Sequence, residues 1–350
     1  MKITHIHIER FRGFQNEDFE VGSLLTAIAG QNGTQKSTLL GIITQTFTLK
    51  TEDSMRVEKP LCGGSYISAF KDKFRLSPTF DKPKGHEWTI SFDAGMDDFT
   101  VESIKRTGDP NVRFWKKGAR QEGDGYISFP TIFLSLKRLV PVAEEAKIIT
   151  DDTLLTQEEL NEFKQLHNKI LIAQTPISSA TTITSKNKQS IGVSTELYDW
   201  NQNSMGQDNL GKIILALFSF KRLHDKYPRQ YKGGILAIDE MDATMYPASQ
   251  VELLKVLRKY ASKLNLQILF TTHSMSLLKA MDDLVQEVTK KEETANQAKI
   301  LYLKKVDDKI AIKQGVNFKG IQLDLNVVAE GNNRKKNRIT AYTEDKENIL

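Results

Sequence analysis

The chain has 350 residues, enough for one large domain or two medium ones with a substantial core. Apolar residues make up 39% of it and charged residues 27%, which excludes the collagen-like, mucin-like and largely disordered classes. The net charge of +5 arises from 49 basic and 44 acidic residues, so it permits a nucleic-acid partner without requiring one.

The first 20 residues alternate between apolar and polar side chains, with Gly13 near the middle. Period-two alternation predicts two antiparallel strands, which we expect beside the apolar strand at residues 24–29. Arg10 and Arg12 lie in this stretch. Each is either a contact to a nucleotide or DNA backbone or a solvated strand residue, and the sequence favours neither interpretation.

A loop joins the apolar strand at residues 24–29 to a helix expected from Ser37 to about residue 47. Its residues are of the types that bind a nucleoside triphosphate. Backbone N–H groups and the helix N-terminus would face the phosphates, Lys36 would reach the β and γ oxygens, and Ser37 would offer a hydroxyl to Mg²⁺. The alternative is a glycine-containing turn between strand and helix, in which the lysine has no binding role. The candidate nucleotide-binding residues are Gly30, Gln31, Asn32, Gly33, Thr34, Gln35, Lys36, Ser37 and Thr38.

Alternating segments return in residues 74–106 and predict, with residues 112–115, an antiparallel sheet layered on the first strands. Residues 129–136 indicate a buried strand, and residues 156–173 one or two short helices without heptads. The Thr/Ser-rich residues 178–190 predict a mobile connection.

The second half alternates strands and helices, which indicates a parallel α/β sheet. A buried helix is expected at residues 210–223, and an amphipathic helix at residues 247–264. The expected strands are residues 233–238, which end in Asp239-Glu240, and residues 266–270, which end in Thr-Thr-His-Ser with His273 as the third residue. Residues 300–303 and 310–312 predict a closing hairpin.

An apolar strand that ends in Asp-Glu places carboxylates beside a phosphate-binding loop. Asp239 then joins Ser37 as a metal ligand for Mg²⁺, and Glu240 polarises the attacking water as general base. His273 follows the next strand and can orient that water on the γ-phosphate. Glu240 and His273 are therefore the candidate catalytic residues. The alternatives are an acidic turn and a structural histidine.

The order of four motifs carries a family resemblance. GQNGTQKST, SMGQDNL, GILAIDEMDATMYP and FTTHS resemble the Walker A, signature, Walker B and switch-histidine series of ABC-type ATPases. IERFRGF resembles the opening of the RecF/SMC-like branch, which includes the OLD-family and Septu anti-phage ATPases, and LSLKRLVP and DEMDATMYP are similar to that defence group. The resemblance implies an α/β ABC-type ATPase head: a mixed, largely parallel P-loop sheet with helices, plus an antiparallel β lobe.

The resemblance also implies a domain plan: a head over residues 1–330. It divides into an N-terminal lobe to about residue 142, a helical or mobile insert at about 143–200, and a C-terminal lobe at about 201–318. Residues 331–350 follow, in which the basic residues 332–338 precede a strand that resembles the start of a TOPRIM-like metal domain. The basic run either tracks a phosphate backbone or is a solvated linker.

The mechanism implied by the family is ATP-dependent pairing of two heads, head to tail. ATP with Mg²⁺ lies between Lys36 of one copy and Ser204, Gly206 and Gln207 of the other, so ATP holds the copies together until hydrolysis releases them. The alternative for this signature segment is a helix cap, since Ser204 or Asp208 can cap the following helix.

Three features depart from the family pattern. Gln35 replaces a loop glycine, which costs roughly 1 kcal/mol if that position needs a positive φ and bears on fast turnover. Tyr246 stands where many relatives carry an acid or a histidine. A γ-phosphate sensor is expected in the segment before Lys137, but no residue is identified for it.

These features predict a cytoplasmic ATP hydrolase that forms a dimer or higher homo-oligomer and regulates a nuclease in anti-phage defence. The nuclease is a partner chain or a fused domain, and DNA or a phage component is the ligand. The single cysteine, the missing signal peptide and the lack of a membrane-length apolar segment favour this compartment. The alternatives are a RecF/SMC-like repair ATPase, an ATP-stabilised scaffold that does not hydrolyse, and a transporter's nucleotide-binding subunit.

Overall fold

The computed structural model describes residues 1–331 apart from 68–69, 94, 106–111, 120–123, 140–147, 152–153 and 186–188. Its longer strands are β1 (Ile3–Phe11), β2 (Phe14–Glu20), β3 (Leu25–Gly30), β5 (Glu87–Phe92), β6 (Phe99–Lys105), β7 (Val112–Lys116), β9 (Thr131–Leu134), β10 (Ile149–Asp151), β11 (Ser179–Thr184), β12 (Gln189–Ser194), β13 (Gly234–Ile238), β14 (Leu266–Thr272), β15 (Ala298–Val306) and β16 (Lys309–Lys313). Two short strands, β4 (Phe47–Thr48) and β8 (Ile127–Ser128), pair with each other. The α-helices are α1 (Lys36–Thr44), α2 (Phe70–Lys73), α3 (Gln157–Leu171), α4 (Met205–Lys226), α5 (Pro247–Lys263), α6 (Met275–Thr289) and α7 (Phe318–Gly331).

The central sheet has the strand order β16-β15-β3-β14-β13-β9. Every pair is parallel except β15 with β16, which form the predicted closing hairpin. Every residue of β3, β13 and β14 is buried, as expected for parallel strands covered on both faces. The carboxyl ends of these three strands lie at one edge of the sheet, and the candidate catalytic residues follow them.

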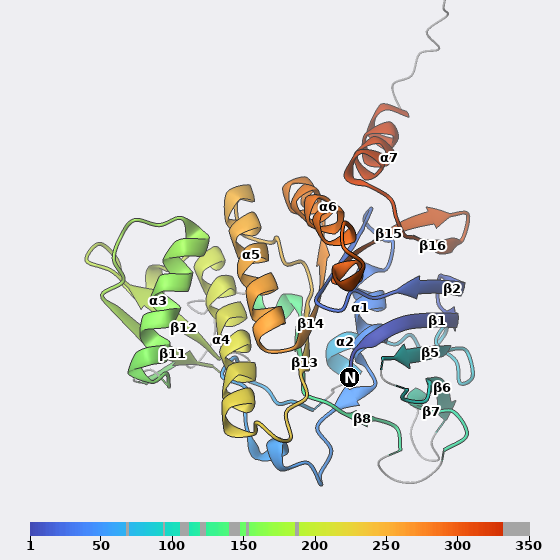
Figure 1. Cartoon of the computed structure of the whole chain (residues 1–350), viewed down its shortest axis with the longest axis horizontal. Helices are drawn as coiled ribbons and strands as arrows, with labels where there is room; N and C mark the ends of the chain where they lie inside the picture. The colour runs from blue at the N-terminus through green and yellow to red at the C-terminus, as the bar shows by residue number, and fades with distance from the viewer. Residues whose placement is uncertain are drawn as a thin grey trace, which may run out of the picture.

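Two hydrophobic cores cover the two faces of this sheet. Helices α4, α5 and α6 pack on one face, against alternate strand residues such as Leu236 and Ile268. Helix α1 and the antiparallel lobe pack on the other face, against the intervening residues such as Ala237 and Leu269. Figure 1 shows α4 and α5 on one side of β13 and β14, and β1, β5, β6 and β7 on the other. The mixed sheet and the separate antiparallel lobe confirm the predicted fold class.

The first two strands belong to the antiparallel lobe, not to the sheet of β3. The order in the lobe is β2-β1-β5-β6-β7, so β5, β6 and β7 extend the first hairpin edge to edge. The prediction that β1 and β2 lie beside β3, with the later strands layered on them, was therefore wrong. The neighbours of β3 are β14 and β15.

The segment predicted to be a mobile connection contains a hairpin. Residues Ser179–Thr184 pair antiparallel with Gln189–Ser194, and β10 adds a third strand. The error has a physical reason: threonine is polar, but its branched Cβ favours strands. One helix, α3, stands where one or two short helices were expected, and a complete capping box at Thr156 and Glu159 fixes its start.

Within the described residues, none of the helices combines the length and the apolar character that crossing a bilayer requires. Helix α7 is the last described element and points away from the body of the molecule (Figure 1). The basic run at 332–338 and the strand expected after it lie outside the described residues.

Candidate functional site

The loop between β3 and α1 has the backbone of a phosphate cradle. Gly33 has a φ of 80°, and a Cβ placed there would meet no atom within 4 Å, so the loop is open at this point. Helix α1 starts without a side-chain cap at Gln35, and its first turn carries no acidic residue. Uncapped N–H groups at a helix N-terminus favour an anion. The loop therefore fits a phosphate group.

Lys36 is folded into this loop and is only 7% exposed. Its Nζ donates to the carbonyl oxygens of Gly30, at 3.0 Å, and Gln31, at 2.9 Å. Burial lowers the pKa of Lys36 below its ordinary value, while the carboxylates of Glu240, Asp239 and Asp242 act in the opposite direction. Lys36 is therefore a cation placed among carbonyls and carboxylates. Phosphate oxygens bound in the loop could replace its two carbonyl contacts.

Gln35 replaces a loop glycine, and its backbone has the positive φ that this position was expected to require, with φ 62° and ψ 32°. Its side chain lies against Gly13 at the β1–β2 turn: a Cβ on Gly13 would come within 2.7 Å of Gln35 Nε2. Its Oε1 is buried without a hydrogen-bond partner among the described residues. The expected backbone strain is therefore present.

The candidate metal ligands meet at the end of the central strands. Ser37 Oγ donates to Asp239 Oδ1 at 2.8 Å, although 202 residues separate them in the sequence. Thr271, fully buried at the end of β14, donates to the same carboxylate oxygen at 2.8 Å. A hydroxyl and a carboxylate are oxygen ligands of the kind that Mg²⁺ takes together with substrate phosphates. These residues fit the cation, and the pair was predicted from the sequence.

Glu240 follows Asp239 in a left-handed conformation, with φ 51°. A non-glycine residue there costs about 1 kcal/mol or more unless its surroundings hold it. Two hydrogen bonds clamp its backbone: its N–H donates to Thr271 Oγ1 at 2.6 Å, and its carbonyl accepts from Arg138 Nη2 at 2.8 Å. The strained turn is thereby fixed directly after Asp239, the candidate metal-binding carboxylate.

His273 and Asp242 lie next to these carboxylates. The backbone N–H of His273 donates to Asp242 Oδ2 at 3.4 Å, and Asp242 Oδ1 is buried without a partner among the described residues. Burial, and then the charge of Lys36, lower the pKa of His273 below 6.5, although the nearby carboxylates oppose the shift. The imidazole is therefore predominantly neutral at pH 7, with one nitrogen free to accept a proton.

The signature segment starts α4 with a complete capping box. Ser204 Oγ accepts from the N–H of Gln207, whose side chain accepts from the N–H of Ser204 at 2.8 Å. Gly206 lies against the turn after Glu240, since a Cβ there would be 2.6 Å from the carbonyl oxygen of Thr244. The helix-cap interpretation is correct locally. Within the described residues, the hydrogen bonds of Ser204 and Gln207 do not reach the loop at 31–35.

Sequence reasoning missed four polar residues that hold this site. Thr271 was visible only as part of a polar strand end, and Arg138 only as part of a basic pair. Asn209 and Gln250 are buried carboxamides that donate to backbone carbonyls of the turn at 242–245. Burial of a polar side chain was the missing information in each case, and periodicity does not give it.

Arg10 and Arg12 are both engaged by carboxylates. Arg10 pairs with Glu87 at 2.9 Å, and Arg12 makes a two-pronged contact with Asp81. Arg12 also reaches Thr38 of α1, with Nη1 3.4 Å from Oγ1. Arg12 is therefore held next to the helix that follows the loop, whereas Arg10 is an ion-paired strand residue.

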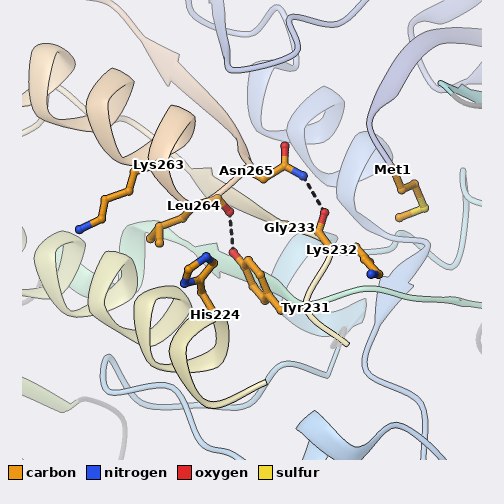
Figure 2. A pocket seen from close by; sticks show the side chains of 8 residues that line it. All are labelled: Met1, His224, Tyr231, Lys232, Gly233, Lys263, Leu264 and Asn265. Atoms are coloured by element: carbon orange, nitrogen blue, oxygen red, sulfur yellow. Dashed lines mark hydrogen bonds between the residues drawn. The ribbon is translucent and has the colours of Figure 1, made fainter. Parts of the chain in front are cut away.

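Two pockets lie away from these residues. One has a volume of about 420 Å³ and includes Tyr231, Lys232 and Asn265, at the amino ends of β13 and β14 (Figure 2). Tyr231 and Asn265 are bonded to backbone carbonyls there. A second pocket, of about 880 Å³, is lined by residues of β2, α6 and β15. Neither includes a candidate site residue.

Comparisons with known proteins agree with this geometry. A family model described as an AAA ATPase domain matches residues 1–190 and 136–278. A search of curated proteins found no match. An SMC head solved with the C-terminal winged-helix domain of ScpA is 14% identical, covers 92% of this chain and 100% of its own, and has a TM-score of 0.52. At this identity the similarity establishes the fold alone.

Two further SMC heads are similar at lower scores. The head domain from Thermotoga maritima is 14% identical, with 90% of this chain and 100% of that chain covered and a TM-score of 0.48. The head with an extended coiled coil bound to the C-terminal domain of ScpA, derived from Pyrococcus furiosus, is 13% identical, with 94% and 99% covered and a TM-score of 0.49.

Proposed function

We propose, from the premise that this chain belongs to the AAA ATPase domain family, that it binds ATP with Mg²⁺ at the β3–α1 loop and hydrolyses it. The observation that carries the proposal is the contact between Ser37 and Asp239, reinforced by Thr271. It joins the phosphate-binding helix to the carboxylate that precedes the general-base candidate. Mg²⁺, when bound, would neutralise phosphate charge there.

The residues of the chain divide the chemistry among themselves. Lys36 leaves its two loop carbonyls for the phosphate oxygens, and the uncapped start of α1 adds further N–H donors. Glu240 polarises the attacking water from its clamped turn. Neutral His273 accepts a hydrogen bond from that water or donates one to the γ-phosphate, which orients the attack.

We further propose that the hydrolytic site is completed by a second copy, head to tail. The cap at Ser204 bonds within its own segment, so the exposed start of α4 remains open to a nucleotide held by another copy. Three exposed large side chains lie nearby: Met205, Tyr246 and Ile172. The hydroxyl of Tyr246 donates to the carbonyl oxygen of Leu171, the residue before Ile172. Exposed apolar side chains that lie close together are a feature of protein interaction sites.

Mixing two inactive variants tests this arrangement. Lys36→Ala disables the loop and Ser204→Arg blocks the signature, so each variant alone should hydrolyse no ATP. A 1:1 mixture should recover about a quarter of the parent rate, because half of the random dimers are heterodimers with one intact composite site. A mixture as inactive as its components, although size analysis shows mixed dimers, would mean that each copy works alone.

The biological role that we propose is control of a nuclease in anti-phage defence. The support is the resemblance of LSLKRLVP and DEMDATMYP to that group. Phage plating on cells that carry this gene with its neighbours, against a Glu240→Gln copy, tests it. Protection that is lost in the variant is expected. Unchanged plating together with sensitivity to DNA damage would favour a repair ATPase instead.

A non-hydrolysing scaffold is the second candidate, and the strained Gln35 is the observation that favours it. A scaffold would bind ATP and assemble without releasing phosphate. Single-turnover measurement of phosphate release separates the two candidates.

A further inference from the structure

Arg138 is the most deeply buried cation near the site. It lies in the 3₁₀ turn η2 (Leu136–Leu139) after β9 and is 1% exposed. Its guanidinium donates to the carbonyls of Leu134 and Ser135, to the carbonyl of Glu240 at 2.8 Å, and to Asn209 Oδ1 at 2.7 Å. These hydrogen-bond acceptors are all uncharged, whereas the carboxylates of Asp239, Glu240 and Asp242 act on the guanidinium through their charge.

Asn209 is the residue through which Arg138 reaches the signature helix. It is 0% exposed and lies in α4, five residues after Ser204. Its Oδ1 accepts from Arg138, and its Nδ2 donates to the carbonyl oxygen of Ala243 at 2.9 Å. The carboxamide of Asn209 thus connects α4 to the turn at 240–243 at two points: directly at Ala243, and through Arg138 at Glu240.

The backbone at Glu240 depends on this connection. Its left-handed φ of 51° is held on the N–H side by Thr271 and on the carbonyl side by Arg138. Gly206 adds a steric contact, because its Cβ position is 2.6 Å from the carbonyl oxygen of Thr244. A displacement of the start of α4 must therefore move this turn, or break a buried hydrogen bond that has no replacement.

We propose that Arg138 and Asn209 form a buried relay that couples the signature helix to the backbone of Glu240 within one copy. The inference rests on the proposed function and adds a regulation to it: engagement of Ser204 and Gly206 by nucleotide sets the orientation of the general base in the same chain. Arg138 and Asn209 are positioning residues. Hydrolysis at one composite site thereby responds to occupation of the other.

Two substitutions cut the relay at different points. Asn209→Leu keeps the side-chain size but removes both hydrogen bonds, and Arg138→Lys keeps the charge but cannot reach all four acceptors. We expect each to lower kcat by about tenfold or more while the Kd for a non-hydrolysable ATP analogue changes by less than about threefold, since the phosphate-binding residues are untouched. Ser219→Ala is the matched control: Ser219 is buried on the same helix and bonded to Leu215 and Leu61, far from the turn, and its kcat should stay near that of the parent.

Amide hydrogen exchange at residues 240–245 gives a second readout that needs no turnover. The analogue should slow exchange there in the parent and in Ser219→Ala, but not in the two relay variants. Relay variants with parent kcat, or with the parent's slowing of exchange, would overturn the relay. A parent protein that releases no phosphate would refute the proposed hydrolysis instead, and the exchange result alone would then decide on the relay.

Discussion

Replacement of Thr271 by valine tests the geometry at the end of β14 most sharply. The change keeps the shape of a fully buried side chain and removes one oxygen. That oxygen donates to Asp239 Oδ1 at 2.8 Å and accepts from the N–H of Glu240 at 2.6 Å. Thr271→Val therefore leaves the part-buried N–H of Glu240 without this partner and the carboxylate of Asp239 without one of its donors.

The expected loss of stability follows from these two bonds. An unsatisfied part-buried N–H and a lost charge-assisted bond together cost about 3 kcal/mol. The entropy of unfolding is about 2.1 cal/mol/K per residue, or roughly 0.7 kcal/mol/K for this chain, so Tm should fall by about 4 °C. The freed turn at Glu240 should also lower kcat for ATP by about tenfold or more.

Calorimetry and phosphate release provide the assay, and Thr26→Val provides the control. Thr26 is equally buried on β3, but its hydroxyl accepts a single uncharged hydrogen bond, from the N–H of Gly22. The control should lose about 1 kcal/mol and retain the parent kcat. A Thr271→Val protein with the Tm and kcat of the parent would refute the reasoning, because the two bonds would then carry neither stability nor orientation.

Three other substitutions probe separate features. The free energy of unfolding of Gln35→Gly, measured by urea denaturation, should exceed that of Gln35→Ala by about 1 kcal/mol, because both variants lose the side chain but only glycine relieves the φ of 62°. Equal urea midpoints for the two variants would exclude backbone strain. Gly206→Ala should abolish ATP-dependent association measured by light scattering, because its Cβ would meet the Thr244 carbonyl oxygen at 2.6 Å, whereas unchanged association would contradict that close packing. His167 is buried, and burial lowers its pKa from 6.5 to about 4 although the side chain of Asn168 opposes the shift, so the stability it contributes is present above pH 6.5 and is lost as the pH falls to 4. His167→Leu should remove up to about 3 kcal/mol of that acid sensitivity, measured by denaturant unfolding at pH 7 and pH 4.5, and an unchanged pH dependence would show that His167 does not titrate as proposed.

The parallel core could be predicted from the sequence because its strands are visible as local patterns of apolar residues. The strands β3, β13 and β14 are short, predominantly apolar runs, and each is followed by polar residues of the candidate site. Parallel strands bring such ends to one edge, so the meeting of Ser37 with Asp239 followed from strand order.

The errors arose where the local pattern does not determine a long-range partner. The alternation in β1 and β2 indicates strands, but it does not specify whether they pair with β3 or with β5. Threonines in β11 read as a polar linker, although their branched side chains suit a strand. The sequence assigned no role to Arg138, since only the tertiary fold encloses it between β9, α4 and the turn at Glu240.

ATP turnover by the purified chain, beside Glu240→Gln and with oligomer size followed with and without ATP, tests the central claim most directly. The account predicts phosphate release by the parent, at least about a hundredfold less by the variant, and ATP-held assemblies that persist in the variant because its binding residues are intact. Tight ATP binding without phosphate release in either protein would contradict hydrolysis, and the chain would then be an ATP-stabilised scaffold.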